Sequence, residues 1–432
     1  PIGVPMLTIV NTKPEFYWLT NYIETLISNV LWKPITSATI ADIYYRNFLK
    51  YAEETGYDKS FIQWQGHDFS FRGMSGIEDA LTSASAHLLS FTGSDTIPSV
   101  DFIERYYHGN CTKELLAGSV QATEHSVMCA GGEINELDTF KRLITETYPS
   151  GIVSIVSDSW DFFNVLDNIL PTLKDDIMNR NGRVVIRPDS GDPADIICGC
   201  YVEDLTKYIE SVDDMNSVID YGDSIPYCFF NEKYVEFDKH KLYRLYGKYY
   251  RLVIGDTIAF ERVYPTSKEL GAIESLYNTF GGRINDKGYI ELDTHIGLIY
   301  GDSITIERQL DILQRLKNKG FSANNLVLGI GSFTYEYVTR DTFGMAMKAT
   351  YAVIDSKGIE IYKNPKTDSG FKKSAKGLLN VSFDQDGKLV LKDQCTAEEE
   401  ATGCLRKVFQ DGYMLVSDKF ETIRERVQQN EK

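Results

Sequence analysis

The sequence lacks the features that mark membrane and nucleic-acid-binding proteins. No run of apolar residues reaches the roughly 18 residues that a helix needs to cross a bilayer. The first residues do not show the basic and then apolar pattern of a signal peptide. Lysine and arginine number 45 against 62 acidic residues, which gives a formal net charge of −17 and disfavours a broad nucleic-acid-binding surface. We therefore expect a cytoplasmic protein that binds neither nucleic acid nor membranes.

Cysteine is also sparse, and its spacing is not that of a zinc site. The seven cysteines are an odd number scattered along the chain, as is typical of reduced thiols. Cys198 and Cys200 form the one close pair, which we interpret as incidental, so we expect no metal site built by the protein alone. The chain is long enough for a large buried core: 432 residues with 43% hydrophobic side chains can form two or three domains or one large barrel with additions.

The stretch VVIRPDSGDP at residues 184–193 is the first candidate for a binding site. Three β-branched residues predict a buried strand that ends at Arg187 and passes into a tight turn. Arg187 can donate two N–H groups to a phosphate or a carboxylate, and Gly191 lets a ligand come close to the backbone. Asp-Ser-Gly is also an ordinary turn and helix cap, so this stretch alone leaves both interpretations open.

Three other predicted strands end in the same way. Each passes into a polar or glycine-rich turn followed by a helix, at Asp158, at Gly301 and Asp302, and at Gly329 and Gly331. Alternating strands and helices with polar residues after the strands are typical of a parallel α/β sheet or barrel, whose strand ends meet on one face. The shared pattern therefore favours a binding site over simple capping.

The residue types at these strand ends suit a phosphorylated sugar. The turn at residues 329–331 leads into a helix whose free N–H groups can meet a phosphate, and Arg340 could add a cation or pair with a neighbour. Asp158, Asp189 and Asp302 could contact ribose hydroxyls or a phosphate-bound Mg²⁺ ion, which prefers oxygen ligands. For each carboxylate, helix capping is the alternative.

Elements outside these units can be predicted as well. A strand is expected at residues 1–10, and two helices at residues 12–32 and 39–55. The remaining predictions are a helix from residue 332 through Arg340 and Asp341, an inserted β-hairpin or small sheet at the Tyr-rich residues 227–264, and, after residue 350, short strands with a last helix at residues 418–428.

Seven motifs together point to one family. They are HDFSFRGMSG, GSD at residues 93–95, EHS, SDSWD, IRPDSG, YGDS and GIGSFTYEYVTRD, and they occur in this order. On these motifs the chain resembles the nicotinamide phosphoribosyltransferases, which are type II phosphoribosyltransferases. The resemblance extends from about residue 9 to the C-terminal helix, apart from the Tyr-rich insertion. It implies an irregular TIM-like α/β barrel with a β-rich domain built from both chain ends.

The resemblance also implies a division into domains. Residues 1–35 would form a strand and helix that join the β-rich domain, and residues 36–349 would form the barrel, with the β insertion at about residues 201–265. Residues 350–432 would complete the β-rich part and add the final helix. The family further implies a homodimer whose active sites are shared between subunits.

Individual residues match functional positions of the family. Phe69 matches the aromatic that stacks on the nicotinamide ring, and Asp95 matches the acceptor for its amide N–H. His125 matches the histidine that ATP phosphorylates. The other matches are phosphate contacts from Arg72, His125, Arg187 and Arg340, the ribose and phosphate cradle of Asp158, Asp189, Gly301 and Asp302, and a phosphate turn at Gly331 and Ser332. Within this set we expect His125, Arg187 and Asp189 to be catalytic.

The activity implied is nicotinamide phosphoribosyl transfer in NAD salvage. Nicotinamide and phosphoribosyl pyrophosphate would give nicotinamide mononucleotide and pyrophosphate. Mg²⁺ would arrive with phosphoribosyl pyrophosphate, and ATP would be a coupling substrate through a phosphohistidine. A carboxylate at Asp95 accepts from a carboxamide but repels the carboxylate of nicotinate, so it selects nicotinamide.

The chain departs from the family in three places. The glycine run is shorter at Gly331, where Ser332 and Phe333 follow, and Leu378 stands after Gly377 where relatives have an arginine. The family's N-terminal segment does not precede residue 1, so we expect either a fragment of a longer or split protein or an incomplete dimer site. Two alternatives stay open: a nicotinate phosphoribosyltransferase, which shares the fold, and a non-catalytic subunit of a split enzyme, which the missing segment and the Tyr-rich insertion favour.

Overall fold

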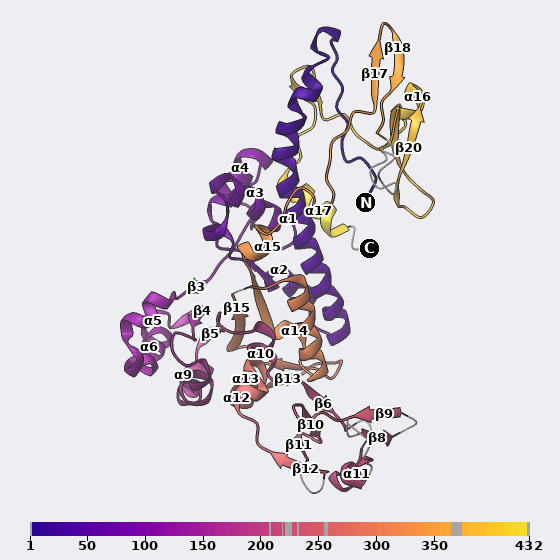
Figure 1. Ribbon diagram of the computed structural model, residues 1–432. Coiled ribbons are helices and arrows are strands. Elements are labelled where there is room, and N and C mark those ends of the chain that lie inside the picture. The colour runs from indigo at the N-terminus through magenta and orange to yellow at the C-terminus, as the bar shows by residue number, and fades with distance from the viewer. Residues whose placement is uncertain are drawn as a thin grey trace. The chain divides into compact units, whose positions relative to one another are not determined.

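The computed structural model describes residues 2–206, 209–217, 219–220, 227–230, 233–254, 258–301, 303–363 and 374–429. The chain divides into two compact units (Figure 1). The barrel unit comprises Ile40–Val100 and Cys111–Tyr337, and the terminal unit comprises Pro1–Thr39, Asp101–Asn110 and Val338–Lys432. Two helices, α1 (Leu19–Thr55) and α4 (Pro98–Tyr107), pass from one unit into the other.

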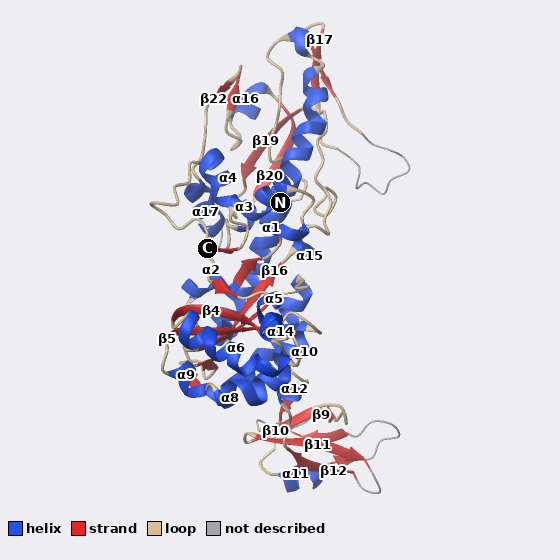
Figure 2. Cartoon of the chain, turned by 90° about the vertical axis from the view of Figure 1, so that its left-hand side faces the viewer, coloured by secondary structure: helices blue, strands red, loops and turns tan. Residues whose placement is uncertain are grey.

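The barrel unit is built on one parallel sheet (Figure 2). Its strands pair in the order β2-β1-β16-β15-β5-β4-β3. They are β1 (Gly66–Asp68), β2 (Gly93–Ser94), β3 (Gln121–Ala122), β4 (Ser150–Val156), β5 (Asn181–Arg187), β15 (Ile296–Tyr300) and β16 (Leu326–Ile330). A parallel bridge between Gly93 and Gly118 joins the segment before β3 to β2, so the two ends of the sheet meet. The predicted irregular α/β barrel is confirmed.

The central barrel strands β4, β5, β15 and β16 are largely apolar and buried. Val153, Ile155, Val184 and Ile186 are fully buried on the paired strands β4 and β5, as expected for a parallel sheet packed inside a layer of helices. The helices of this unit are α2 (Ile62–Gln65), α3 (Ile77–His87), α5 (His125–Gly131), α6 (Glu136–Arg142), α7 (Phe162–Asn164), α8 (Leu170–Thr172), α9 (Lys174–Met178), α10 (Pro193–Cys198), α12 (Ser267–Leu270), α13 (Ala272–Phe280), α14 (Ile306–Asn318) and α15 (Ser332–Tyr335). A short hairpin, β13 (Gly282–Ile284) and β14 (Ile290–Leu292), precedes β15.

The Tyr-rich insertion forms small sheets with a core of its own. One sheet has the order β12-β11-β10-β6 and the other β7-β8-β9. Their bounds are β6 (Val202–Asp204), β7 (Ile219–Asp220), β8 (Tyr227–Phe230), β9 (Lys233–Glu236), β10 (Leu242–Leu245), β11 (Lys248–Ile254) and β12 (Ile258–Val263), with helix α11 (Val212–Ser217) between β6 and β7. Phe237, Tyr243 and Phe260 pack edge to face at its centre. Parts of the predicted insertion, such as residues 221–226, lie outside the described residues.

The terminal unit combines the first half of α1 with short hairpins. Its antiparallel pairs are β17 with β18, β19 with β20, and β21 with β22. The bounds are β17 (Tyr351–Ile354), β18 (Lys357–Glu360), β19 (Leu378–Phe383), β20 (Leu389–Cys395), α16 (Ala397–Ala401), β21 (Phe409–Gln410), β22 (Tyr413–Met414) and α17 (Phe420–Gln429). The short strands and the last helix therefore lie where the sequence predicts them.

The two predicted N-terminal helices are one helix, and the expected break between them is wrong. Helix α1 continues through Pro34, which cannot donate a backbone hydrogen bond. Ser37, Ala41 and Phe48 are fully buried along one face of α1. Burial of this face outweighs the cost of proline in a helix, which is about 3 kcal/mol.

Two further predictions near segment ends are wrong. Residues 2–10 form no strand: Ile2 and Val10 are highly exposed, and Pro5 lacks the N–H that a strand ladder needs. The helix expected through Arg340 ends at Tyr335. The backbone N–H of Thr339 instead donates to the hydroxyl oxygen of Thr342 at 2.9 Å. This local hydrogen bond competes with continuation of the helix. No helix in the described part of the chain combines the length and apolarity needed to cross a membrane.

Candidate active site

The candidate residues of the barrel unit follow the carboxyl ends of its strands. Phe69 follows β1, Asp95 follows β2, and His125 opens the helix after β3. Asp158 comes shortly after β4, and Arg187 is the last residue of β5. The remaining positions are Asp189 after β5, Gly301 directly after β15, and Gly331 and Ser332 after β16. Because all seven strands are parallel, these residues lie on one face of the barrel, where barrel enzymes bind their substrates.

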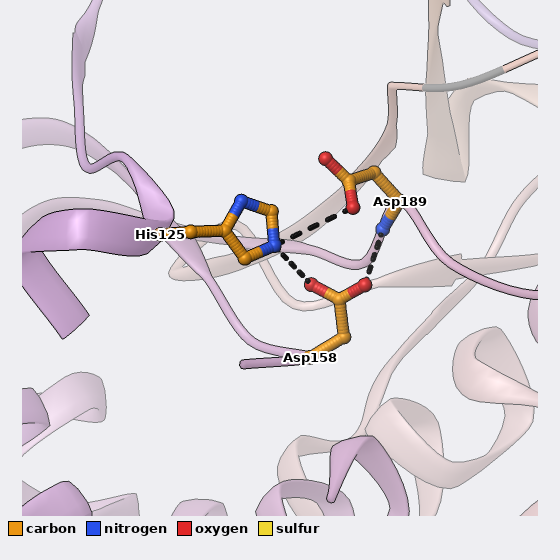
Figure 3. A group of neighbouring side chains, drawn as sticks. All are labelled: His125, Asp158 and Asp189. Carbon is orange, nitrogen blue, oxygen red and sulfur yellow. Dashed lines mark hydrogen bonds and ion pairs between the residues drawn. The ribbon is translucent and has the colours of Figure 1, made fainter. Parts of the chain in front are cut away.

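His125, Asp158 and Asp189 form a compact cluster on that face (Figure 3). Nε2 of His125 lies 3.4 Å from Oδ1 of Asp158 and 3.5 Å from Oδ1 of Asp189. One ligand atom from each residue fits within 4.8 Å of the others. Two carboxylates and an imidazole at this spacing can hold a divalent cation or orient the imidazole.

The Asp158 carboxylate is held in place by hydrogen bonds from the turn that follows β5. Its Oδ2 accepts the backbone N–H groups of Asp189, at 3.0 Å, and of Ser190, at 2.9 Å, and the Ser190 hydroxyl at 2.6 Å. Burial raises the pKa of Asp158, but these hydrogen bonds and the nearby His125 outweigh it and lower the pKa. Burial and repulsion from Asp158 raise the pKa of Asp189. The pair therefore combines a carboxylate that stays ionised with one that holds a proton more readily.

Arg187 and Phe69 pack against each other at the centre of the face. The Arg187 guanidinium carbon lies 4.8 Å from the centroid of the Phe69 ring. Arg187 is buried, and its Nε has no hydrogen-bond partner among the described residues. A Cβ at Gly329 would lie 2.4 Å from the Phe69 ring, and one at Gly301 would lie 3.4 Å from Nε of Arg187. Glycine at both positions therefore makes room for the aromatic ring and the cation.

Asp95 is held by two residues that the sequence did not reveal. Its Oδ1 lies 2.8 Å from Nε2 of His67 and accepts the Ser119 hydroxyl at 2.6 Å. Burial raises the pKa of Asp95, but the bonds from His67 and Ser119 outweigh it and lower the pKa. His67 lies two residues before Phe69, and the two ring centroids are 4.7 Å apart; the sequence pattern gives no sign that Asp95 lies beside them.

Asp68 is a third residue of this region that sequence reasoning missed. Its fully buried carboxylate accepts the Ser70 backbone N–H at 2.9 Å, and the hydroxyls of Ser94 and Thr96 at 2.9 and 2.7 Å. These bonds connect the turn after β1 with the turn after β2. They fix the backbone next to Phe69 and next to Asp95. The only sequence signal was a carboxylate at the end of a strand.

Three of the candidate residues are less closely tied to this cluster. Arg72 is exposed on a short 3₁₀ turn and forms no ion pair with a described residue. Ser332 packs against Gly73, where a Cβ would lie 2.1 Å from its hydroxyl oxygen. Arg340 belongs to the terminal unit, where it lies 3.5 Å from Asp341 and lines a pocket of about 230 Å³ with Glu24 and Trp32. Asp302 lies outside the described residues.

Comparisons with known proteins identify the family. The nicotinate phosphoribosyltransferase (NAPRTase) family profile matches residues 64–247 and 235–413. A nicotinamide phosphoribosyltransferase of Acinetobacter baylyi is 45% identical over 432 residues, which cover 99% of this chain and 73% of that protein. One of Mycoplasma pneumoniae is 35% identical over 368 residues, covering 84% of this chain and 65% of that protein.

A solved structure, nicotinate-nucleotide pyrophosphorylase from Pyrococcus furiosus, superposes with a TM-score of 0.45 at 11% identity, over 92% of this chain and 70% of that chain. The family profile and the Acinetobacter relative each match well over half of the chain. On those two matches, this chain belongs to the nicotinate phosphoribosyltransferase family.

Proposed function

We infer that this chain is a nicotinamide phosphoribosyltransferase, which forms nicotinamide mononucleotide and pyrophosphate from nicotinamide and phosphoribosyl pyrophosphate. The Acinetobacter and Mycoplasma relatives carry that name. The observation that carries the choice of base is Asp95, whose Oδ2 is bonded to no described residue while Oδ1 accepts two bonds. A free carboxylate oxygen accepts an N–H of a carboxamide and repels the carboxylate of nicotinate.

The chain's own contribution to the reaction is positioning and charge. The pyridine nitrogen attacks the anomeric carbon as pyrophosphate leaves, and positive charge develops on the sugar ring. Phe69 offers an aromatic surface for the pyridine ring, and Arg187 can donate its unused N–H groups to the leaving pyrophosphate. No side-chain nucleophile is needed, because both reactants are held in line by these contacts.

The proposal includes Mg²⁺ bound together with phosphoribosyl pyrophosphate. Asp158 and Asp189 offer carboxylate oxygens within 4.8 Å of each other and of His125, and Mg²⁺ prefers oxygen ligands. The ion would neutralise negative charge on the pyrophosphate. Asp158 suits this task because its lowered pKa keeps it ionised, although burial alone would raise that pKa.

The proposal also includes coupling to ATP through His125. The Nε2 nitrogen of His125 faces two carboxylates at 3.4 and 3.5 Å, so the proton belongs on Nε2 and the lone pair on Nδ1. Nδ1 can attack the γ-phosphorus of ATP while ADP leaves. Incubation with γ-labelled ATP should label the chain on histidine, and His125→Ala should abolish the label; undiminished label in that variant would disprove the role.

We further propose that the chain works as a cytoplasmic homodimer with shared active sites. Tyr22, Leu26 and Val30 are exposed at helical spacing along the first half of α1, which is unusual for a surface that faces only water. The six cysteines whose side chains the structure describes are free thiols, as expected in a reducing compartment. Light scattering should give twice the chain mass, and Leu26→Glu should halve it.

The decisive experiment is a paired assay of the purified chain with phosphoribosyl pyrophosphate and either nicotinamide or nicotinate. We expect nicotinamide mononucleotide and little nicotinate product. Asp95→Ala should weaken the selection of nicotinamide more than it weakens phosphoribosyl pyrophosphate binding. Activity on nicotinate alone would favour the second candidate, a nicotinate phosphoribosyltransferase, which the name of the matched family supports.

A further inference from the structure

We propose that His67 is a positioning residue that aims the Asp95 carboxylate at the carboxamide of the base, and that it thereby sets the affinity for nicotinamide. The inference rests on the proposed function, because it assumes that Asp95 binds the base. The two residues stand on neighbouring parallel strands, where His67 is in register with Gly93 at the start of β2. Nε2 of His67 lies 2.8 Å from Oδ1 of Asp95.

The direction of this hydrogen bond follows from the chemistry of its partners. The Asp95 carboxylate is also the acceptor for the Ser119 hydroxyl at 2.6 Å, on the same oxygen. An ionised carboxylate can only accept, so the proton of the bond belongs to Nε2 of His67. Two donors, one on β1 and one in the segment before β3, therefore converge on Oδ1 and fix the plane of the carboxylate. Oδ2 is left to accept from a ligand, and the Asp95 side chain is 45% exposed.

His67 is itself held too tightly to turn away from Asp95. Its side chain is only 12% exposed, and its ring centroid lies 4.7 Å from that of Phe69. A Cβ at Gly93 would lie 2.6 Å from Nδ1 of His67, so the imidazole lies directly on the backbone of β2. The same ring thus contacts the stacking aromatic and the base-binding carboxylate, and it sets their relative placement.

The consequence is a division of labour within the base site. The charge of Asp95 excludes nicotinate whichever way the carboxylate is turned, because like charges repel at any orientation. The affinity for nicotinamide needs a lone pair aimed at the amide N–H, which depends on the bond from His67. Loss of His67 should therefore weaken nicotinamide binding and leave the exclusion of nicotinate in place.

The test compares His67→Ala with His67→Gln, whose amide N–H can reach the place of Nε2. We expect His67→Ala to raise the KM for nicotinamide about tenfold, the equivalent of one lost hydrogen bond. The KM for phosphoribosyl pyrophosphate and kcat should move less than about twofold. His67→Gln should restore most of the nicotinamide affinity. A purely structural role would move both KM values together, and that result would overturn the proposal, as would an alanine variant with an unchanged KM for nicotinamide.

A double-mutant cycle separates this proposal from the function on which it rests. In an Asp95→Ala background, His67→Ala should have no further effect on the KM for nicotinamide, because there is no carboxylate left to aim. Full additivity of the two effects would overturn the proposal. If the unmodified chain forms no nicotinamide mononucleotide, the proposed function itself fails. If His67→Ala does not fold, the cycle is run with His67→Phe, which keeps the ring but cannot donate; a KM for nicotinamide equal to that of the unmodified chain would then refute the role of the bond.

Discussion

The two ends of β5 carry arginines that are equally buried and differently used. Arg180, just before the strand, and Arg187, its last residue, are each 6% exposed. The terminal nitrogens of Arg180 donate to the carbonyls of Ile144 at 2.5 Å, of Gly151 at 3.0 Å, and of Tyr148. The guanidinium of Arg187 donates to no described residue, and it packs on the face of the Phe69 ring.

This difference shows which buried charge is structural and which awaits a ligand. A buried charge is costly unless it is paired or hydrogen-bonded. The two terminal nitrogens of Arg180 meet that need within the chain, although its Nε, like that of Arg187, has no hydrogen-bond partner among the described residues. Arg187 is only partly compensated by the aromatic face, so its remaining N–H groups need acceptors from outside. We therefore propose that the arginine at the amino end of β5 serves stability and the arginine at its carboxyl end binds an anion.

The largest expected effect is that of Arg187→Ala on activity. Removing a preorganised donor that faces developing negative charge typically costs about a hundredfold to a thousandfold in rate. We expect a loss of that size in kcat/KM for phosphoribosyl pyrophosphate, measured by steady-state kinetics. The melting temperature should stay the same or rise, because an unpaired buried charge is removed. A clear loss of stability with little loss of rate would break the comparison.

Arg180→Ala should show the opposite behaviour. The change leaves three backbone carbonyls without their donor, and we expect it to lower the free energy of unfolding by roughly 2–4 kcal/mol. Urea denaturation checks this value. The kcat of the remaining folded molecules should be close to normal, because Arg180 lies at the other end of the barrel from the candidate site. If Arg180→Ala abolished turnover in fully folded protein, the assignment of the two strand ends would be wrong.

The sequence was sufficient to predict the residues at the carboxyl ends of the barrel strands, Arg187 among them. Arg187, Asp158 and Gly301 are marked by their own positions, since each follows a run of apolar residues that can only be a buried strand. Once the strands are parallel, their carboxyl ends must converge. A parallel α/β sheet or barrel, with candidate residues at its strand ends, could therefore be predicted before any packing was known, and the family resemblance indicated the barrel.

What the sequence did not reveal depends on contacts between segments. His67 and Ser119 meet Asp95 only because β1, β2 and the segment before β3 lie side by side. The continuity of α1 through Pro34 depends on which face is buried, and local propensity predicts a break there. Arg340 was misplaced for a related reason, since a threonine pair ends the helix pattern earlier than the motif indicates.

Two glycines allow the same comparison between the carboxyl and amino ends of the barrel strands. Gly329 stands at the carboxyl end of β16, where a Cβ would lie 2.4 Å from the Phe69 ring, whereas Gly182 stands at the amino end of β5, where a Cβ would lie 2.0 Å from the carbonyl oxygen of Gly151. Gly329→Ala should raise the KM for nicotinamide about tenfold, since overpacking costs about 1–3 kcal/mol. Gly182→Ala should instead lower the melting temperature with no specific change in KM. Equal effects of both variants on KM would contradict the distinction.

The smallest expected effect concerns Glu136. Like Arg187 it is buried without full hydrogen bonding, but a glutamate can lose its charge by taking up a proton. Its Oε1 is buried without a hydrogen-bond partner, and burial, with repulsion from Asp161 and Glu133, raises the pKa of Glu136 to about 7. Because the folded pKa lies above the unfolded value, the protonated group supports the fold at low pH, and this support is lost as the pH rises through about 7. The Glu136→Gln variant stays neutral throughout. Between about pH 5 and pH 8 the unmodified chain should therefore lose stability relative to the variant, on the order of 1 kcal/mol in urea denaturation. If the free energy of unfolding of the two proteins changed with pH in parallel, Glu136 would be ionised in the fold and have a partner. Its charge would then be satisfied within the chain, as that of Arg180 largely is, and unlike that of Arg187.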